Sequence, residues 1–165
     1  MKSNEILSDV KAKFGFVPNV LQELARSPIA AKVYLQGQDA MGGATLTAKE
    51  QQVVSLAIST ANKCAYCQSA HRTAARKMGV SEEDLSAIET GHQLPADERL
   101  AGLVLATRRL AELNGWLEPR DLNELEDMGV NRIQLYEIIA VIGLKTITNY
   151  VNHIAHVPID PQFGG

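Results

Sequence analysis

Cys64 and Cys67 are the only cysteines in the 165-residue chain, and two residues separate them. Two cysteines cannot make the disulfide framework of a secreted protein. In a reducing compartment a C-x-x-C pair is typical of metal or redox chemistry. His71 follows four residues after Cys67. On a helix, residues three and four apart share a face, so Cys67 and His71 are neighbours and Cys64 joins them if the helix includes it.

These three side chains supply the groups that a thiol peroxidase or a disulfide reductase needs. A thiol near a helix N-terminus has a lowered pKa and a larger thiolate fraction. A histidine one turn later can accept the thiol proton or hold the thiolate. A second cysteine one turn earlier can attack a sulfenic acid and close a disulfide. Redox chemistry is therefore the interpretation that the spacing favours.

Two other interpretations remain open. The cysteines can be small buried hydrophobic residues, with His71 a hydrogen-bonded core histidine. A structural zinc ion normally takes four ligands, and His92 is the only nearby addition to the three residues. His153 and His156 fit better as the cap of a last helix than as a metal pair. We expect no metal and no cofactor.

The elements around this motif are predicted to be helices, because the stretches without glycine or proline are rich in helix-forming residues. Thr47 and Glu50 have the spacing of a capping box, with the Thr47 hydroxyl and the Glu50 carboxylate satisfying free amides at a helix start. Helices are expected over about 18–26, 28–40, 47–62, 65–78 and 97–113, with further helices beginning near Ser81, Pro119 and Asn131.

Residues 53–59 could also form a buried strand, and a strand before C-x-x-C would suggest a thioredoxin-like fold. No glycine or proline occurs from Ala44 to Met78, and a capping box opens the stretch, so a helix is favoured. The predicted fold is all-α: a compact bundle of about seven to nine helices, a single domain over residues 1–165 with its motif core at about 46–90.

Composition limits the partners. Hydrophobic residues make up 45% and the formal net charge is −3, which argues against disorder and against nucleic acid as the main partner. The longest apolar run, Ile138–Leu144, is far shorter than the roughly 20 residues that span a bilayer. The first residues lack the pattern of a signal peptide, so none is expected. We therefore expect a cytoplasmic protein without a membrane partner.

The helix after Asn131 is predicted to be apolar on nearly every face, and such a helix is normally buried. In a chain of this size, part of that burial is expected to lie between subunits. The predicted protein is therefore a homo-oligomer. The residues that carry this prediction are Leu135, Ile138, Ile139, Val141, Ile142, Leu144, Ile147 and Val151.

A family resemblance extends this interpretation. The stretch from Leu46 to His71, which contains Cys-Ala-Tyr-Cys-Gln-Ser-Ala-His, closely resembles the carboxymuconolactone decarboxylase family. Within the family it is similar to the alkyl hydroperoxidase D-like branch, whose mark is C-x-x-C-x-x-x-H. Residues 14–19 and 149–153 resemble the peroxidase-related proteins of that branch.

The resemblance implies an all-helical fold, assembly into a dimer, trimer or hexamer, and reduction of hydroperoxides through the cysteine pair. Cys67 matches the cysteine that peroxide oxidises, Cys64 the one that resolves it, and His71 the proton-relay histidine. The family's relay carboxylate commonly lies twelve positions before the first cysteine, where this chain has Gln52. Glu50 is a nearby acid, but it lies about 200° away around the helix. A capping role suits it better.

The predicted function is that of a thiol-dependent peroxidase or disulfide oxidoreductase, with a hydroperoxide as substrate and a protein dithiol as reductant. The candidate catalytic residues are Cys67, Cys64, His71, Glu50 and Gln52. One alternative is a decarboxylase of the same fold acting on a lactone acid, although proton-transfer chemistry has no need of C-x-x-C. Another is a non-catalytic helical assembly module with an inert cysteine pair.

Overall fold

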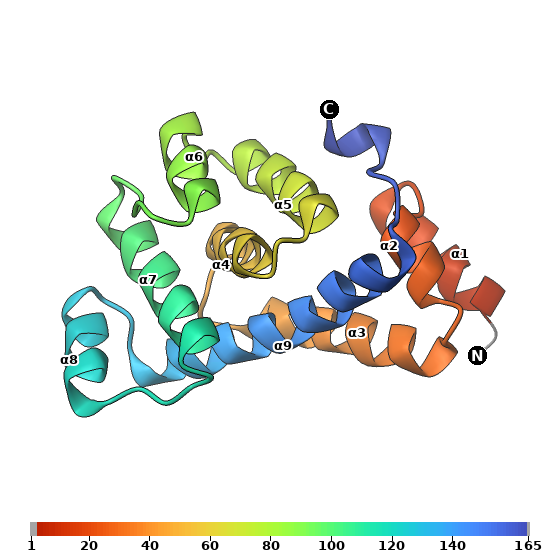
Figure 1. Cartoon of the computed structure of the whole chain (residues 1–165). Coiled ribbons are helices and arrows are strands. Elements are labelled where there is room, and N and C mark those ends of the chain that lie inside the picture. The colour runs from red at the N-terminus through yellow and green to blue at the C-terminus, as the bar shows by residue number, and fades with distance from the viewer. Residues whose placement is uncertain (1–2, 165) are drawn as a thin grey trace.

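The computed structural model describes residues 3–164, and in these residues helices pack around a central helix, α4 (Figure 1). Helices α5, α6, α7 and α9 contact α4, while α1–α3 gather at the end of the bundle where α9 finishes. The bounds are α1 Ser3–Phe14, α2 Asn19–Leu24, α3 Pro28–Ala40, α4 Ala48–Ala61, α5 Ala65–Lys77, α6 Glu82–Thr90, α7 Glu98–Glu112, α8 Pro119–Asp127 and α9 Arg132–Ala155, with short 3₁₀ turns at Met41–Gly43 and Pro161–Phe163.

The predicted all-α fold is confirmed, and the described residues contain no strand. Local sequence signals place most helix starts correctly. Thr47 and Glu50 form the predicted capping box of α4, and Ser81 caps α6 with its hydroxyl. One difference occurs at the N-terminus. Helix α1 was not among the predicted elements, since only Ile6 and Val10 are buried on it and its apolar stripe is narrow.

Residues 53–59 are helical, which excludes the strand and the thioredoxin-like alternative. All seven of these residues are buried, because α4 has neighbours on most of its sides. The apolar run that resembles a strand is therefore the signature of a surrounded helix. No helix in residues 3–164 is long and apolar enough to cross a membrane.

A second apolar cluster joins the N-terminal helices to α5. It includes Tyr34 of α3 and the two cysteines, together with Ile6, Val10, Val20, Leu21, Leu24, Ala31 and Tyr66. Tyr66 is a packing aromatic of this cluster. Its hydroxyl bonds the Asp160 carboxylate and accepts the Val20 N–H at 3.3 Å, and its ring meets Phe163 edge-on. The cysteines thus lie where α5, the N-terminal helices and the C-terminal segment meet.

Burial on α9 is one-sided in the single chain. Leu135, Ile138 and Val141 are buried, whereas Ile139 is 46% exposed. Towards its C-terminal end, the buried face becomes polar and is formed by Lys145, Thr148, Asn149 and Asn152. The exposed large apolar residues on α9 are Ile133, Tyr136, Ile139, Tyr150 and Ile154. Helix α9 therefore contributes a polar stripe to the interior and leaves an apolar stripe in solvent.

Candidate functional site

The turn between α4 and α5 places the first cysteine. Lys63 has a left-handed backbone with φ of 55°. The Lys63 N–H bonds Thr60 O and the Cys64 N–H bonds Ser59 O, both at 2.9 Å, which is the Schellman arrangement of a helix end. The chain reverses here without the usual glycine. Cys64 becomes the N-cap of α5, with φ −92° and ψ 95°.

Cys67 lies in the first turn of α5, and His71 follows one turn later on the same helix. Both thiols are free and buried, Cys64 with 2% and Cys67 with 3% of its surface exposed. Asn152 of α9 donates from Nδ2 to Cys67 Sγ at 3.4 Å. The buried polar face of α9 therefore contacts the second cysteine.

The two thiols differ in acidity. A hydrogen bond from the Cys64 thiol lowers the pKa of Cys67 to about 6. Burial opposes this effect, while the Lys145 charge and hydrogen bonds from Asn149 and Thr148 reinforce it. The same hydrogen bond to Cys67, together with burial, raises the pKa of Cys64 far above its ordinary range. Cys67 is therefore the thiolate and Cys64 the thiol of the pair.

His71 lies between two polar partners. Its Nδ1 is 2.8 Å from Gln52 Oε1, and its Nε2 is 3.2 Å from Lys145 Nζ. An ammonium can only donate, so Nε2 accepts from Lys145, and Nδ1 carries the proton that it donates to the Gln52 oxygen. Burial, followed by the Lys145 charge, holds the pKa of His71 well below its usual value. His71 is thus a neutral imidazole with both nitrogens occupied.

Lys145 and Tyr34 belong to this site, and the sequence analysis missed both. Lys145 is 2% exposed and donates to the Tyr34 hydroxyl at 3.0 Å. One signal was available: Lys145, Thr148, Asn149 and Asn152 recur at helical spacing within an otherwise apolar helix. A polar stripe on a buried helix face indicates a buried polar site.

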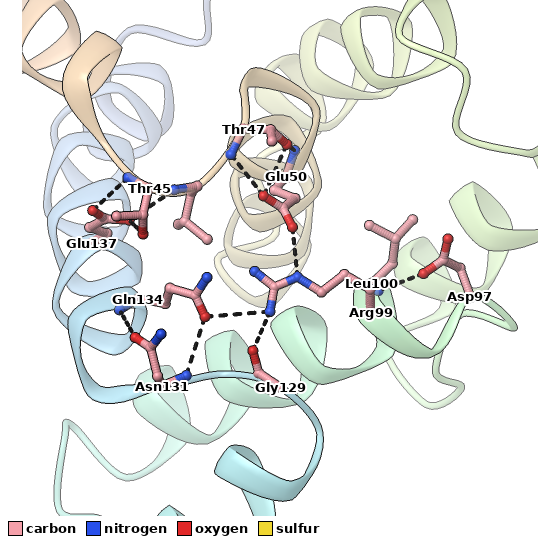
Figure 2. Close-up of polar contacts among 11 residues, drawn as sticks. Thr45, Thr47, Glu50, Asp97, Arg99, Leu100, Gly129, Asn131, Gln134 and Glu137 are labelled. Atoms are coloured by element: carbon pink, nitrogen blue, oxygen red, sulfur yellow. Dashed lines mark hydrogen bonds and ion pairs between the residues drawn. The ribbon is translucent and has the colours of Figure 1, made fainter.

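Glu50 does not join the cysteine–histidine group. Figure 2 shows its carboxylate beside Thr47 and pointing to Arg99 of α7. Oε2 accepts the Thr47 N–H at 2.7 Å, and Oε1 accepts from Arg99 Nε at 2.6 Å. Arg99 also donates to Gly129 O at 2.5 Å. The structure therefore places Glu50 in a network that ties the start of α4 to α7 and to the start of α9, while Gln52 contacts His71.

A cavity of about 550 Å³ opens beside the first cysteine. Cys64 and Tyr66 of α5, Asn152 and His153 of α9, and residues 157–159 are part of its lining. Cys67 is not among its lining residues. An incoming group in this cavity would therefore meet Cys64 Sγ first.

Residues 3–164 contain no group of three or more histidine, cysteine, aspartate or glutamate residues that could hold a metal ion. His92, the possible fourth zinc ligand in the sequence, is exposed on the loop after α6. The arrangement of buried thiolate, thiol, neutral imidazole and ammonium is suited to thiol chemistry.

A comparison with known protein families gives one match. The family model described as the carboxymuconolactone decarboxylase family matches residues 30–112, which is half of the chain. The chain belongs to this family. The matched segment contains Gln52, Cys64, Cys67 and His71, and it ends before Lys145. No curated protein matches the chain in sequence.

Solved structures of similar fold cover nearly the whole chain. A peroxidase-related protein from Silicibacter sp. TM1040 is 24% identical, with a TM-score of 0.78, over 98% of this chain and 86% of that protein. The alkylhydroperoxidase AhpD core protein from Ralstonia eutropha JMP134 is 22% identical, with a TM-score of 0.82 over the same shares. The debrominase Bmp8 is 16% identical, with a TM-score of 0.77, over 98% and 87%.

These likenesses confirm the AhpD-like fold that the resemblance implied. At such identities they establish the fold alone. The evidence for this chain's activity therefore comes from its own residues.

Proposed function

We propose that this family member is a thiol-dependent peroxidase that reduces hydroperoxides through Cys67 and Cys64. The observation that carries the proposal is the division of acidity within the pair. The pKa of Cys67 is lowered to about 6, so the thiolate is the main form at neutral pH, while Cys64 keeps its proton. The thiolate is the nucleophilic form of cysteine, and redox-active cysteines are those with a low pKa.

In the proposed cycle the Cys67 thiolate attacks the terminal oxygen of the hydroperoxide. The O–O bond breaks, Cys67 becomes a sulfenic acid and the alkoxide leaves as an alcohol after taking up a proton. Cys64 then attacks Cys67 sulfur, the S–O bond breaks, and a disulfide and water form. A dithiol reduces this disulfide and becomes oxidised itself, which restores both thiols.

We propose a protein dithiol as the reductant, and the cavity indicates where it would attack. In a disulfide, exchange begins at the sulfur that the attacking thiolate can reach. Cys64 lines the cavity and Cys67 does not, so the reductant is proposed to attack Cys64. Because the cycle needs a dithiol reductant, we propose that the protein acts in a reducing cytoplasm. We also propose a homo-oligomer as the working form.

Steady-state consumption of an alkyl hydroperoxide, with an excess of a small dithiol, tests the proposal. We expect turnover in the unmodified protein and none in Cys67→Ser. In single-turnover experiments the rate should rise through about pH 6 and then level off, because it follows the Cys67 thiolate. Cys64→Ser is the matched control: it should still oxidise once, giving a trappable sulfenic acid on Cys67. Equal turnover in Cys67→Ser would contradict the proposal.

The remaining interpretations are outcomes of the same assays. A decarboxylase acting on a lactone acid would release carbon dioxide whether or not the cysteines are alkylated. An inert helical module would show neither turnover nor a low-pKa thiolate in a thiol titration. The lowered pKa of Cys67 favours the peroxidase over both.

A further inference from the structure

Lys145 is a buried cation, and a nearby negative charge would offset the cost of burying it. Its side chain projects from α9 among α3 and α5, and 2% of its surface is exposed. Its polar contacts are the Tyr34 hydroxyl at 3.0 Å and His71 Nε2 at 3.2 Å, and the ammonium also lies 5.1 Å from the centre of the Tyr34 ring. None of the ion pairs found in residues 3–164 includes Lys145. A buried charge is costly unless a nearby opposite charge offsets it.

The groups that face Lys145 leave one candidate for this anion. Tyr34 of α3 offers a hydroxyl oxygen that accepts from Lys145. His71 of α5 is a neutral acceptor, and Gln52 of α4 is an uncharged amide. Beyond Lys145 itself, the buried polar face of α9 carries only threonine and asparagine. Two thiols share a buried cluster with Tyr34, those of Cys64 and Cys67. Cys67 is the one that lies one turn before His71, and it contacts Asn152 on the same buried face of α9 as Lys145.

We propose that the Lys145 ammonium is the counter-ion of the Cys67 thiolate and the group that supplies the proton for the departing alkoxide. Its position is fixed by two contacts from other helices, the Tyr34 hydroxyl and His71 Nε2. His71 is then a positioning residue that holds the ammonium beside the thiolate. The thiolate part of this inference stands on the contact of Lys145 with His71 and on the contact of Asn152, on the same face of α9, with Cys67. The proton-transfer part rests on the proposed peroxidase cycle.

The proton balance closes with Lys145, the two cysteines, the hydroperoxide and the dithiol. Before reaction the pair is Cys67 thiolate and Lys145 ammonium. Attack on the hydroperoxide forms the S–O bond and breaks the O–O bond, and Lys145 gives one proton to the alkoxide, leaving a neutral amine. Cys64 and the Cys67 sulfenic acid then form the disulfide and water. When a dithiol reduces the disulfide, the proton of the regenerated Cys67 thiol returns to the Lys145 amine, which restores the starting pair.

The test measures the acidity of Cys67 directly. The otherwise unmodified protein and three variants are alkylated with iodoacetamide across about pH 5 to 9, a range that spans the ordinary His and Cys pKa values. The rate of modification at Cys67 is read by peptide mass spectrometry. Lys145→Met removes the charge and keeps an unbranched apolar chain, whereas Lys145→Arg keeps the charge. Lys77→Met, at the exposed end of α5, is the matched control.

We expect Lys145→Met to move the alkylation midpoint of Cys67 upward by about 1–3 pH units, the usual effect of losing a nearby opposite charge. Lys145→Arg should keep most of the original midpoint, and Lys77→Met should keep all of it. An unchanged midpoint in a folded Lys145→Met protein overturns the inference. If Lys145→Met does not fold, an upward shift in Lys145→Gln supports the inference and an unchanged midpoint overturns it.

Peroxide assays on the same variants separate this inference from the proposed function. A shifted midpoint without hydroperoxide turnover in the unmodified protein supports the thiolate–ammonium pair and defeats the peroxidase. Turnover with an unshifted midpoint keeps the peroxidase and defeats the role of Lys145. If both hold, the pH profile of single-turnover oxidation in Lys145→Met should move with the alkylation midpoint. At pH values above both midpoints, where Cys67 is a thiolate in either protein, the oxidation rate of Lys145→Met should still be lower by roughly 10²- to 10⁴-fold, the usual contribution of a general acid. Equal rates there contradict the proton-supply step.

Discussion

At the scale of single residues, Gln52 determines whether His71 can pass on a proton. The amide oxygen accepts the Nδ1 proton at 2.8 Å, and an amide does not titrate near neutral pH. His71 is therefore held as a neutral imidazole, and its pKa is further lowered by burial and by Lys145. A relay that ends in an amide cannot pass a proton beyond the histidine. This is the chemical consequence of the departure from the family pattern noted in the sequence.

Gln52→Glu is expected to raise hydroperoxide turnover. A carboxylate in this position can receive the Nδ1 proton while Nε2 takes up another, so His71 can pass on a proton that the amide of the natural protein cannot receive. General acid–base help is worth roughly 10²- to 10⁴-fold, and the desolvation of a new half-buried carboxylate reduces that gain. Steady-state rates across about pH 5 to 9 are the measurement, and a new titration step should appear. Unchanged rates at every pH would show that His71 carries no proton in the cycle.

At the scale of elements, the turn before α5 depends on one strained residue. Lys63 has φ of 55° in an exposed position, and no glycine relieves it. A left-handed conformation costs a residue with a Cβ roughly 1–2 kcal/mol, and more if the side chain is β-branched. The position of Cys64 therefore depends on a conformation that few side chains tolerate.

Lys63→Ile is expected to lower the free energy of unfolding by about 1–2 kcal/mol, while Lys63→Gly should be neutral or stabilising. Urea unfolding monitored by circular dichroism measures both. Lys77→Ile, at an exposed position of helix α5 in the ordinary right-handed region, is the control and should change stability by only a few tenths of a kcal/mol. Equal losses at positions 63 and 77 would contradict the argument from backbone strain.

The Glu50 carboxylate stabilises the folded protein and takes no part in the proposed reaction. Its pKa is lowered: burial raises it, but hydrogen bonds from Arg99 and Thr47 outweigh burial. A carboxylate with a lowered folded pKa stabilises the protein above its unfolded pKa and loses that contribution as pH falls through the folded value. Glu50→Gln should therefore cost about 1–2 kcal/mol near neutral pH, less at acidic pH, and leave peroxide turnover unchanged. Loss of turnover in a stable Glu50→Gln protein would instead make Glu50 the working acid.

Contacts between residues close in the sequence could be predicted, whereas contacts between residues far apart in the sequence could not. The Thr47–Glu50 capping box lies within four residues, and Cys67 and His71 within one helical turn, so spacing alone predicts them. Lys145 reaches His71 across 74 positions and Tyr34 across 111, and no periodicity reports such a pairing. The sequence predicts a lowered pKa of Cys67 from the helix N-terminus, whereas its largest cause in the structure is the hydrogen bond from Cys64.

At the scale of the whole molecule, the exposed apolar side chains of α9 bear on assembly. Ile154 is 83% exposed and Tyr150 is 55% exposed on the outer side of the helix that carries Lys145 inside. Contiguous exposed apolar surface is typical of protein–protein contacts. Assembly through α9 would therefore stiffen the helix that holds the proposed counter-ion.

We expect a particle larger than one chain in analytical ultracentrifugation, and dissociation in Ile139→Glu. Ile142, one turn away, packs against the core, so a charge there would disturb folding as well as assembly. Leu94→Glu, on the exposed loop after α6, is the control and should leave the particle size unchanged. A well-folded monomer of the unmodified protein would show that the apolar face of α9 is not a contact between copies.

The central claim is that the Cys67 thiolate reduces a hydroperoxide and Cys64 completes the reaction. Mass spectrometry after one equivalent of hydroperoxide at about pH 7 tests it most directly. For the unmodified protein we predict a mass loss of two hydrogens and a Cys64–Cys67 disulfide in the peptide map. For Cys64→Ser we predict a single added oxygen on Cys67. Two unmodified thiols, or an oxygen found on Cys64 in Cys67→Ser at the rate of the unmodified protein, would contradict it.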